Sequence, residues 1–171
     1  MIALKNILVA TDFSEPSVVA LDYGRDLARS YDATLHVVHV IEESLALHGP
    51  EIGFAYADIQ RNIEAAVRRD LDAALSADDR RTLNARTVIT RAGNVSHAIT
   101  EYAKNNAIDL IIVGTHGRGA IQRFLIGSVA ERVMRIAPCP VLTVRAHEQD
   151  FIDAHVNEDA SHDRHDEATH M

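Results

Sequence analysis

Hydrophobic residues along the chain fall into two patterns, unbroken runs and spaced stripes. Five short runs rich in Val, Ile and Leu have the length of strands buried on both faces, and they cover residues 4–10, 34–41, 85–91, 110–115 and 141–145. Between the runs, apolar residues recur every three or four positions, as on the buried side of an amphipathic helix. These stripes predict helices at residues 15–30, at residues 55–77, from Val95 onward and from Val129 onward. Ser14 and Asn94 are expected to cap two of them.

Strands and helices alternate throughout this pattern. Such alternation predicts an α/β fold, here a single doubly wound parallel sheet of five strands with helices on both faces. In a sheet of this kind, ligands bind at the carboxyl ends of the strands, where the winding reverses. Asp12 follows the first predicted strand and Gly114 ends the fourth. If these two strands are neighbours, the two residues share one site.

The stretch after the fourth strand has the composition of a phosphate-binding loop. Gly114, Gly117 and Gly119 force a turn, and Gly127-Ser128 directly precedes a helical stripe. A helix N-terminus presents unpaired N–H groups and the positive end of its dipole, which suits an anion. The usual phosphate-binding sequences G-x-x-x-x-G-K-[ST] and G-x-G-x-x-G are absent. From spacing alone, a plain strand–loop–helix corner explains the glycines equally well.

Three separated segments resemble one known family. Gly114, two residues, Gly117, nine residues and Gly127-Ser128 resemble the ATP-binding signature of the universal stress protein family. The segments 6–14, NILVATDFS, and 138–144, PCPVLTV, agree with the same family and lie in the right order. The resemblance covers residues 1–146 as one domain and implies the strand order 3-2-1-4-5 of a Rossmann-like fold similar to the adenine nucleotide alpha hydrolases. The acidic, His-rich tail of residues 147–171 is not covered and is expected to be disordered.

The resemblance also implies a set of nucleotide-binding residues. Ala10, Thr11, Asp12 and Val40 would line the adenosine part, with Val40 using its backbone. Ribose and phosphates would be held by Val113, Gly114, Gly117, Gly127, Ser128 and Val129. His116, Arg118 and Arg123 could neutralise phosphate charge, although roles in a solvated loop explain them equally well.

The implied ligand is ATP, or another adenine nucleotide, accompanied by Mg²⁺ or Mn²⁺. Asp12 would contact the nucleotide directly or through its cation; the alternative is a helix-capping or turn aspartate. In the family the last strand commonly pairs across a two-fold axis, so residues 141–145 would form the edge of a homodimer. The implied function is a nucleotide-dependent regulatory protein of stress adaptation. A slow ATPase or self-phosphorylating enzyme, or an interaction protein that binds no nucleotide, are the alternatives.

Composition narrows the function classes. The formal net charge is −8, and residues 147–171 contribute eight Asp or Glu and one Arg, so the remainder is nearly neutral. Residues 1–146 therefore have no excess of Lys and Arg that would bind the backbone of a nucleic acid. No apolar run approaches the length of a membrane span, and a single Cys agrees with a reducing compartment, so a cytoplasmic protein is expected. Nothing in the sequence forms a nucleophile–base pair, so fast ATP hydrolysis is not expected.

Several histidines and the cysteine receive weaker predictions. Five of the ten His lie in the tail, at positions 147, 155, 162, 165 and 170. They predict either a metal-binding tract or a solubilising acidic tail. His36 and His39 lie three residues apart and therefore on opposite faces of a strand, which favours packing roles over a shared metal. Cys139 lacks a C-x-x-C partner and is expected to be a buried or idle thiol.

Overall fold

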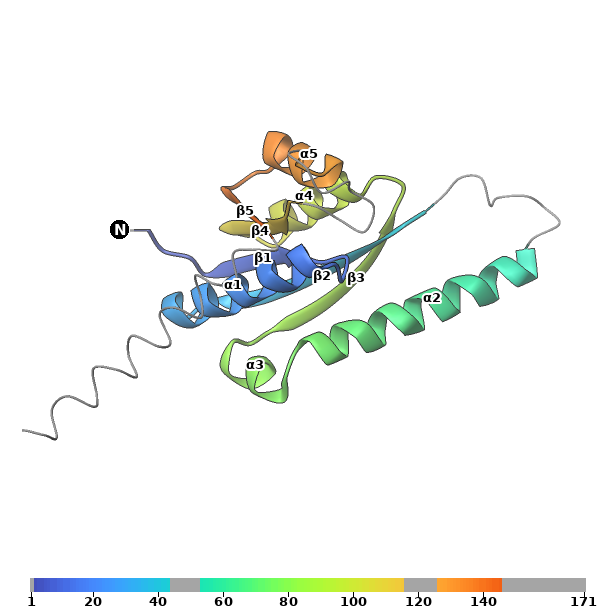
Figure 1. Ribbon diagram of the computed structural model, residues 1–171, viewed down its shortest axis with the longest axis horizontal. Coiled ribbons are helices and arrows are strands. Elements are labelled where there is room, and N and C mark those ends of the chain that lie inside the picture. Colours follow the sequence, from blue (N-terminus) through green and yellow to red (C-terminus); the bar gives the residue numbers. More distant parts are fainter. Residues whose placement is uncertain (1, 44–52, 116–125, 146–171) are drawn as a thin grey trace, which may run out of the picture.

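The computed structural model describes residues 2–43, 53–115 and 126–145 (Figure 1). Its ten elements follow one another as β1 (Asn6–Ala10), α1 (Glu15–Tyr31), β2 (Thr34–Glu42), α2 (Gly53–Ala74), α3 (Ala77–Thr82), β3 (Arg86–Ala92), α4 (Val95–Asn105), β4 (Leu110–Gly114), α5 (Ser128–Ile136) and β5 (Val141–Val144). The expected alternation of strands and helices is therefore confirmed.

The five strands form one parallel sheet in the order β3-β2-β1-β4-β5. Both the fold class and the strand order implied by the family resemblance are confirmed. The central strand β1 lies between β2 and β4, and Ala10 at its end pairs with Val38 on one side and Val113 on the other. This register brings the residues that follow β1 next to the residues that end β4. Asp12 and Gly114 consequently lie at the same edge of the sheet.

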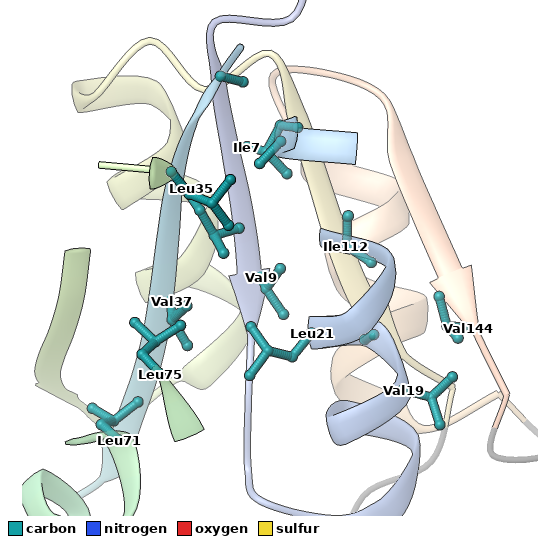
Figure 2. Packing of buried hydrophobic residues seen from close by; sticks show 14 of the residues in the cluster. Ile7, Val9, Val19, Leu21, Leu35, Val37, Leu71, Leu75, Ile112 and Val144 are labelled. Atoms are coloured by element: carbon teal, nitrogen blue, oxygen red, sulfur yellow. The ribbon is translucent and has the colours of Figure 1, made fainter. Parts of the chain in front are cut away.

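The sheet separates two hydrophobic cores. The larger core lies under α1, α2 and α3; it includes Ile7 and Val9 of β1, Leu35 and Val37 of β2 and Ile112 of β4 (Figure 2). The smaller core lies under α4 and α5 and uses the alternate positions of the same strands, such as Leu8, Val38 and Ile111. Helix α1 approaches the sheet closely, since a Cβ at Gly24 would lie 2.4 Å from Cγ2 of Val9.

The helix predicted at residues 55–77 corresponds to α2, which ends three residues earlier, and a second helix that was not predicted follows it. Helix α2 begins at Gly53 and ends at Ala74, and the short α3 starts afresh at Ala77. Ser76 breaks the continuity because its side chain accepts the backbone N–H of Asp79 while the Asp79 side chain accepts the N–H of Ser76. This reciprocal capping box begins a new helix at that position. The apolar stripe of α2 ends at Leu75, and α3, with the sequence ADDRRT, has no such stripe, which is why periodicity alone misses the second helix.

The two predicted caps have different outcomes. Asn94 caps α4 as expected, because its side chain accepts the backbone N–H of His97. Ser14 occupies the N-cap position of α1 but makes no side-chain cap hydrogen bond there. Its hydroxyl instead donates to a carboxylate oxygen of Asp12. The predicted tail of residues 147–171 lies outside the described residues.

None of the helices within the described ranges is long and apolar enough to cross a membrane.

Candidate functional site

A cavity of about 460 Å³ lies at the carboxyl ends of β1, β2 and β4. Residues from the N-terminal turns of α4 and α5 border it as well. The lining residues are Ala10, Thr11, Asp12, Ser17, Val38, His39, Val40, Glu42, Val95, Ile99, Val113, Gly114, Gly127, Ser128, Val129 and Ala130. This is the edge at which doubly wound sheets bind ligands. A cavity of this size accommodates a molecule such as a nucleotide.

The turn between β1 and α1 forms one wall and is built by its own side chains. The backbone N–H of Phe13 donates to the Thr11 hydroxyl at 3.0 Å, and that of Ser14 donates to Oδ1 of Asp12 at 3.0 Å. The Thr11 hydroxyl also lies 3.1 Å from that of Ser17, on the first turn of α1. Asp12 therefore stabilises the turn, which was the alternative explanation for this residue. It also lines the cavity.

The start of α5 forms the opposite wall. Gly127 is the N-cap residue, and it provides no side-chain cap hydrogen bond. Its own N–H donates to the carbonyl of Thr115, while its carbonyl accepts the N–H of Glu131 at 2.9 Å. The first N–H groups of a helix have no acceptor within the helix. The N-terminal backbone of α5, with the positive end of its dipole, therefore borders the cavity at Ser128, Val129 and Ala130.

The rest of the lining is largely apolar, and two acidic groups border the cavity as a whole. Val38 and Val40 of β2 lie on one side, and Val95 and Ile99 of α4 lie on the other. Asp12 and Glu42 add two carboxyl groups, and no Lys or Arg belongs to the described part of the lining. An anion entering this cavity therefore meets helix-terminal N–H groups and carboxylates, and a cation accompanying the anion would offset the repulsion.

Comparison with known proteins identifies the family. The model of the universal stress protein family matches residues 3–145. The chain belongs to this family. Universal stress protein A homolog 1 of Coxiella burnetii is 36% identical over 146 residues, which cover 82% of this chain and 95% of the relative. Universal stress protein YxiE of Bacillus subtilis is 30% identical over 145 residues, covering 81% and 97%.

Solved structures of the family share the fold. The universal stress protein UspA from Lactobacillus plantarum superposes with a TM-score of 0.70 at 27% identity, covering 85% of this chain and all of that chain (100%). A universal stress protein crystallised in complex with cAMP superposes with a TM-score of 0.53 at 25% identity, covering 85% and 99%.

The site residues implied by the family resemblance converge where the structure describes them. Each one within the described ranges lines the cavity: Ala10, Thr11, Asp12, Val40, Val113, Gly114, Gly127, Ser128 and Val129. His116, Gly117 and Arg118, together with Arg123, lie outside the described residues. Their assignment to phosphate binding stays a prediction.

Packing explains the glycine at position 114, and the sequence alone did not indicate this. A Cβ at this position would lie 2.9 Å from the carbonyl carbon and Cβ of Pro16 and 3.0 Å from the backbone N of Ser17. Side chains do not approach backbone this closely, so the end of β4 can pass the first turn of α1 only as glycine. The glycine therefore serves the fold even without a ligand, and a substitution at Gly114 is a poor test of phosphate binding.

The sequence prediction missed some of the residues that line the cavity, although the periodic spacing of residues along β2 and α4 indicates them. Val38 and Glu42 alternate with the predicted Val40 along one face of β2, and Val95 and Ile99 lie four residues apart on α4. These spacings follow the periods of a strand and a helix. His39 belongs to the other face of β2, and its role depends on a contact across strands that no single-strand pattern contains.

The weaker predictions for His36 and Cys139 also have outcomes. His36 and His39 contact different elements: Nδ1 of His36 lies 2.8 Å from the Tyr102 hydroxyl of α4, and His39 contacts the β1–α1 turn. No group of three or more His, Cys, Asp or Glu within the described ranges is arranged to hold a metal. Cys139 is half-buried; burial, followed by the charge of Asp109, raises the pKa of its thiol.

Proposed function

We propose that this universal stress protein binds an adenine nucleotide, with ATP and a divalent cation as the preferred ligand, and that occupancy regulates its assembly or partner binding. The observation that carries the proposal is the pairing of an apolar slot with a helix N-terminus across one cavity at the carboxyl ends of β1 and β4. The complex of a related structure with cAMP supports an adenine nucleotide as the ligand class.

The two ends of the cavity suit the two ends of a nucleotide. The adenosine part would lie against Ala10, Thr11 and Val40, where valine side chains offer an apolar surface for a planar base. The phosphates would lie at Gly127, Ser128 and Val129, where backbone N–H groups and the Ser128 hydroxyl can donate to phosphate oxygens.

A divalent cation fits the charges of the site. A triphosphate bound in this cavity without a cation would be repelled by the carboxylates of Asp12 and Glu42, which line it. Mg²⁺ in proteins is commonly bound by one or two carboxylates together with substrate phosphates. We infer that Asp12 contacts such a cation through the carboxylate that also accepts the N–H of Ser14. The cation supplies charge neutralisation, and the chain supplies the walls and the donors.

A homodimer and a cytoplasmic location complete the proposal. β5 is an edge strand of the sheet, and Val141, Leu142 and Thr143 remain half-buried there. An edge strand presents unpaired backbone groups that a second copy can pair with across a two-fold axis. The single cysteine, which is not in a disulfide, agrees with a reducing compartment.

The test is calorimetric titration of ATP with Mg²⁺ into the full chain, after confirming that no nucleotide co-purifies. Gly127→Leu places a branched side chain at the start of α5, and we expect its affinity to fall at least about tenfold. The control is Gly93→Leu, also a glycine before a helix, whose added Cβ would meet no atom closer than the carbonyl oxygen of Glu43 at 4.0 Å. The control should bind like the wild type.

Two outcomes contradict the proposal. If ATP, AMP and cAMP all give no heat with or without Mg²⁺, and no nucleotide co-purifies, the cavity does not bind adenine nucleotides. If Gly127→Leu binds as tightly as the wild type, the phosphates do not lie at α5. Titrations of AMP and cAMP in the same series rank the three nucleotides and so test the preference for ATP.

A further inference from the structure

The turn between β1 and α1 holds a residue in an unfavourable backbone conformation. Phe13 has φ of 62°, in the left-handed region that non-glycine residues rarely adopt. Such a conformation persists when surrounding contacts determine it, and it occurs often at functional sites. The contacts inside the turn are the hydrogen bonds to the Thr11 hydroxyl and the Asp12 carboxylate. They tie the turn to itself, while the backbone N–H of Thr11 donates to the carbonyl of Val38 at 2.9 Å and joins the start of the turn to β2.

His39 contacts the turn from the neighbouring strand. Its Nδ1 lies 2.8 Å from the carbonyl oxygen of Thr11. A carbonyl oxygen only accepts, so Nδ1 carries the proton and donates it in this bond. The imidazole also stacks on the Phe13 ring, with centroids 4.9 Å apart and planes 21° from parallel. His39 thus contacts the residue before Asp12 through a hydrogen bond and the residue after Asp12 through ring stacking.

We propose that His39 is a positioning residue that fixes the Asp12 turn as a wall of the cavity. It acts through Thr11 and Phe13, by one polar and one apolar contact, and keeps the Asp12 carboxylate and the backbone beside it in one arrangement. A fixed wall lowers the ordering cost that a ligand would otherwise bear on binding. The consequence for affinity rests on the proposed nucleotide function; the consequence for the turn itself does not.

Three substitutions separate the two contacts. His39→Asn keeps an N–H donor close to the position of Nδ1 and removes the ring. His39→Phe keeps a ring to stack on Phe13 and removes the donor. His39→Ala removes both. The control is His97→Ala, which deletes an imidazole from the exposed surface of α4.

The first readout needs no ligand. Amide hydrogen exchange, measured by NMR, reports local opening of the hydrogen bonds made by the N–H groups of Phe13 and Ser14. We expect exchange at these two amides to be about five- to tenfold faster in His39→Ala. His39→Asn and His39→Phe should lie between His39→Ala and the wild type, and His97→Ala should match the wild type. Amides of β3 and α3 serve as internal references.

Two exchange results overturn the proposal. Unchanged exchange at Phe13 and Ser14 in His39→Ala would show that the turn holds its shape without the two contacts from His39. An equal acceleration across β3, α3 and the turn would show that His39 contributes to overall stability and not to this wall. The milder variants His39→Asn and His39→Phe decide the question if the alanine variant does not fold.

The second readout is the affinity for ATP with Mg²⁺. We expect His39→Ala to bind about tenfold more weakly and His39→Asn to recover part of that loss. Faster exchange in the turn combined with unchanged affinity would remove the ligand role from His39. If the wild-type protein binds no nucleotide, the proposed function fails, while the exchange measurement still decides whether His39 fixes the turn.

Discussion

Helices α1, α2 and α3 cover one face of the sheet, and α4 and α5 cover the other (Figure 1). On the first, sealed face the strand side chains pack into a continuous core, whereas on the second face the strands also border a cavity. Strand β2 contributes to both. Leu35 and Val37 are 0% exposed on the sealed side, while Val40 on the other side is only half-buried and lines the cavity. One strand therefore supplies core on one face and cavity lining on the other, because its side chains alternate.

The two faces should contribute differently to the stability of the fold and to the proposed binding of a nucleotide. The sealed face excludes water over a continuous cluster, so its side chains gain the full transfer free energy of burial. The cavity face gives up part of that gain at Val40, which is only half-buried beside a space of about 460 Å³, whereas Val38 and Val113 at the same space are 1% and 3% exposed. Substitutions on the two faces should consequently separate into effects on folding and effects on ligand binding.

The sharpest test truncates the same residue type on the two faces of β2. Val37→Ala removes two buried carbons from the sealed core and should lower the free energy of unfolding by about 2–3 kcal/mol. Val40→Ala should cost less than about 1 kcal/mol, since the site is already open, and should weaken nucleotide binding about three- to fivefold. Urea unfolding and calorimetric titration measure the two effects. Equal losses of stability from both substitutions would contradict the division of tasks between the faces.

A charged cluster closes the sealed face at the junction of α1 and α3. The carboxylate of Asp79 accepts from Nε of Arg25 at 3.1 Å, from Arg29 at 3.0 Å and from the backbone N–H of Ser76 at 3.1 Å. Its side chain is 5% exposed, while those of Arg25 and Arg29 are 19% and 48% exposed. Burial by itself would raise the pKa of Asp79, but hydrogen bonds from Ser76 and the charge of Arg25 lower it below its ordinary value of 3.8.

Asp79→Asn should therefore destabilise the fold by about 2 kcal/mol, less than for a fully buried pair because both arginines reach solvent. Because the pKa of Asp79 is lower in the folded state than in the unfolded state, this stabilisation is fully present at pH values above the unfolded-state pKa. It is lost as the pH falls through the folded-state pKa. The control Asp72→Asn removes the ion pair between Asp72, whose side chain is 59% exposed, and Arg80. This substitution should change the free energy of unfolding by less than about 0.5 kcal/mol. Nucleotide affinity should be unchanged in both variants. An affinity loss in Asp79→Asn would show that this junction and the cavity are coupled.

The sequence predicted these two faces unequally, for physical reasons. The sealed face follows from periodicity, because buried positions such as Val9 and Ile112 must be apolar. The cavity required the register between strands: Ala10 pairs with Val38 and Val113, and this pairing alone joins the segments around Asp12 and Gly114. The contact from His39 to Thr11 and the passage of Gly114 past Pro16 depend on distances across elements. No pattern along the chain encodes such distances.

The cavity face also contains a buried titratable pair. His36 is 3% exposed, its Nδ1 lies 2.8 Å from the Tyr102 hydroxyl, and its Nε2 has no hydrogen-bond partner in the part of the chain that the structure describes. Burial, followed by the positive charge of Arg86, lowers the pKa of His36 below its ordinary value of 6.5. The neutral ring is therefore favoured in the folded protein. His36 lies two residues before Val38 on the same face of β2, so protonation would place a cation beside the cavity-lining strand.

The smallest expected effect is a pH dependence of stability that originates in this pair. Since the pKa of His36 is lower in the folded state than in the unfolded state, the unfolded chain binds the extra proton first, and stability falls as pH drops below about 6.5. Urea unfolding at pH 7.5 and pH 5.5 should show a smaller loss in His36→Phe than in the wild type. His97→Gln, which removes an exposed imidazole from α4, should keep the wild-type loss. If His36→Phe also keeps that loss, the pH dependence originates elsewhere, and the face that opens into the cavity is no more acid-sensitive than the sealed one.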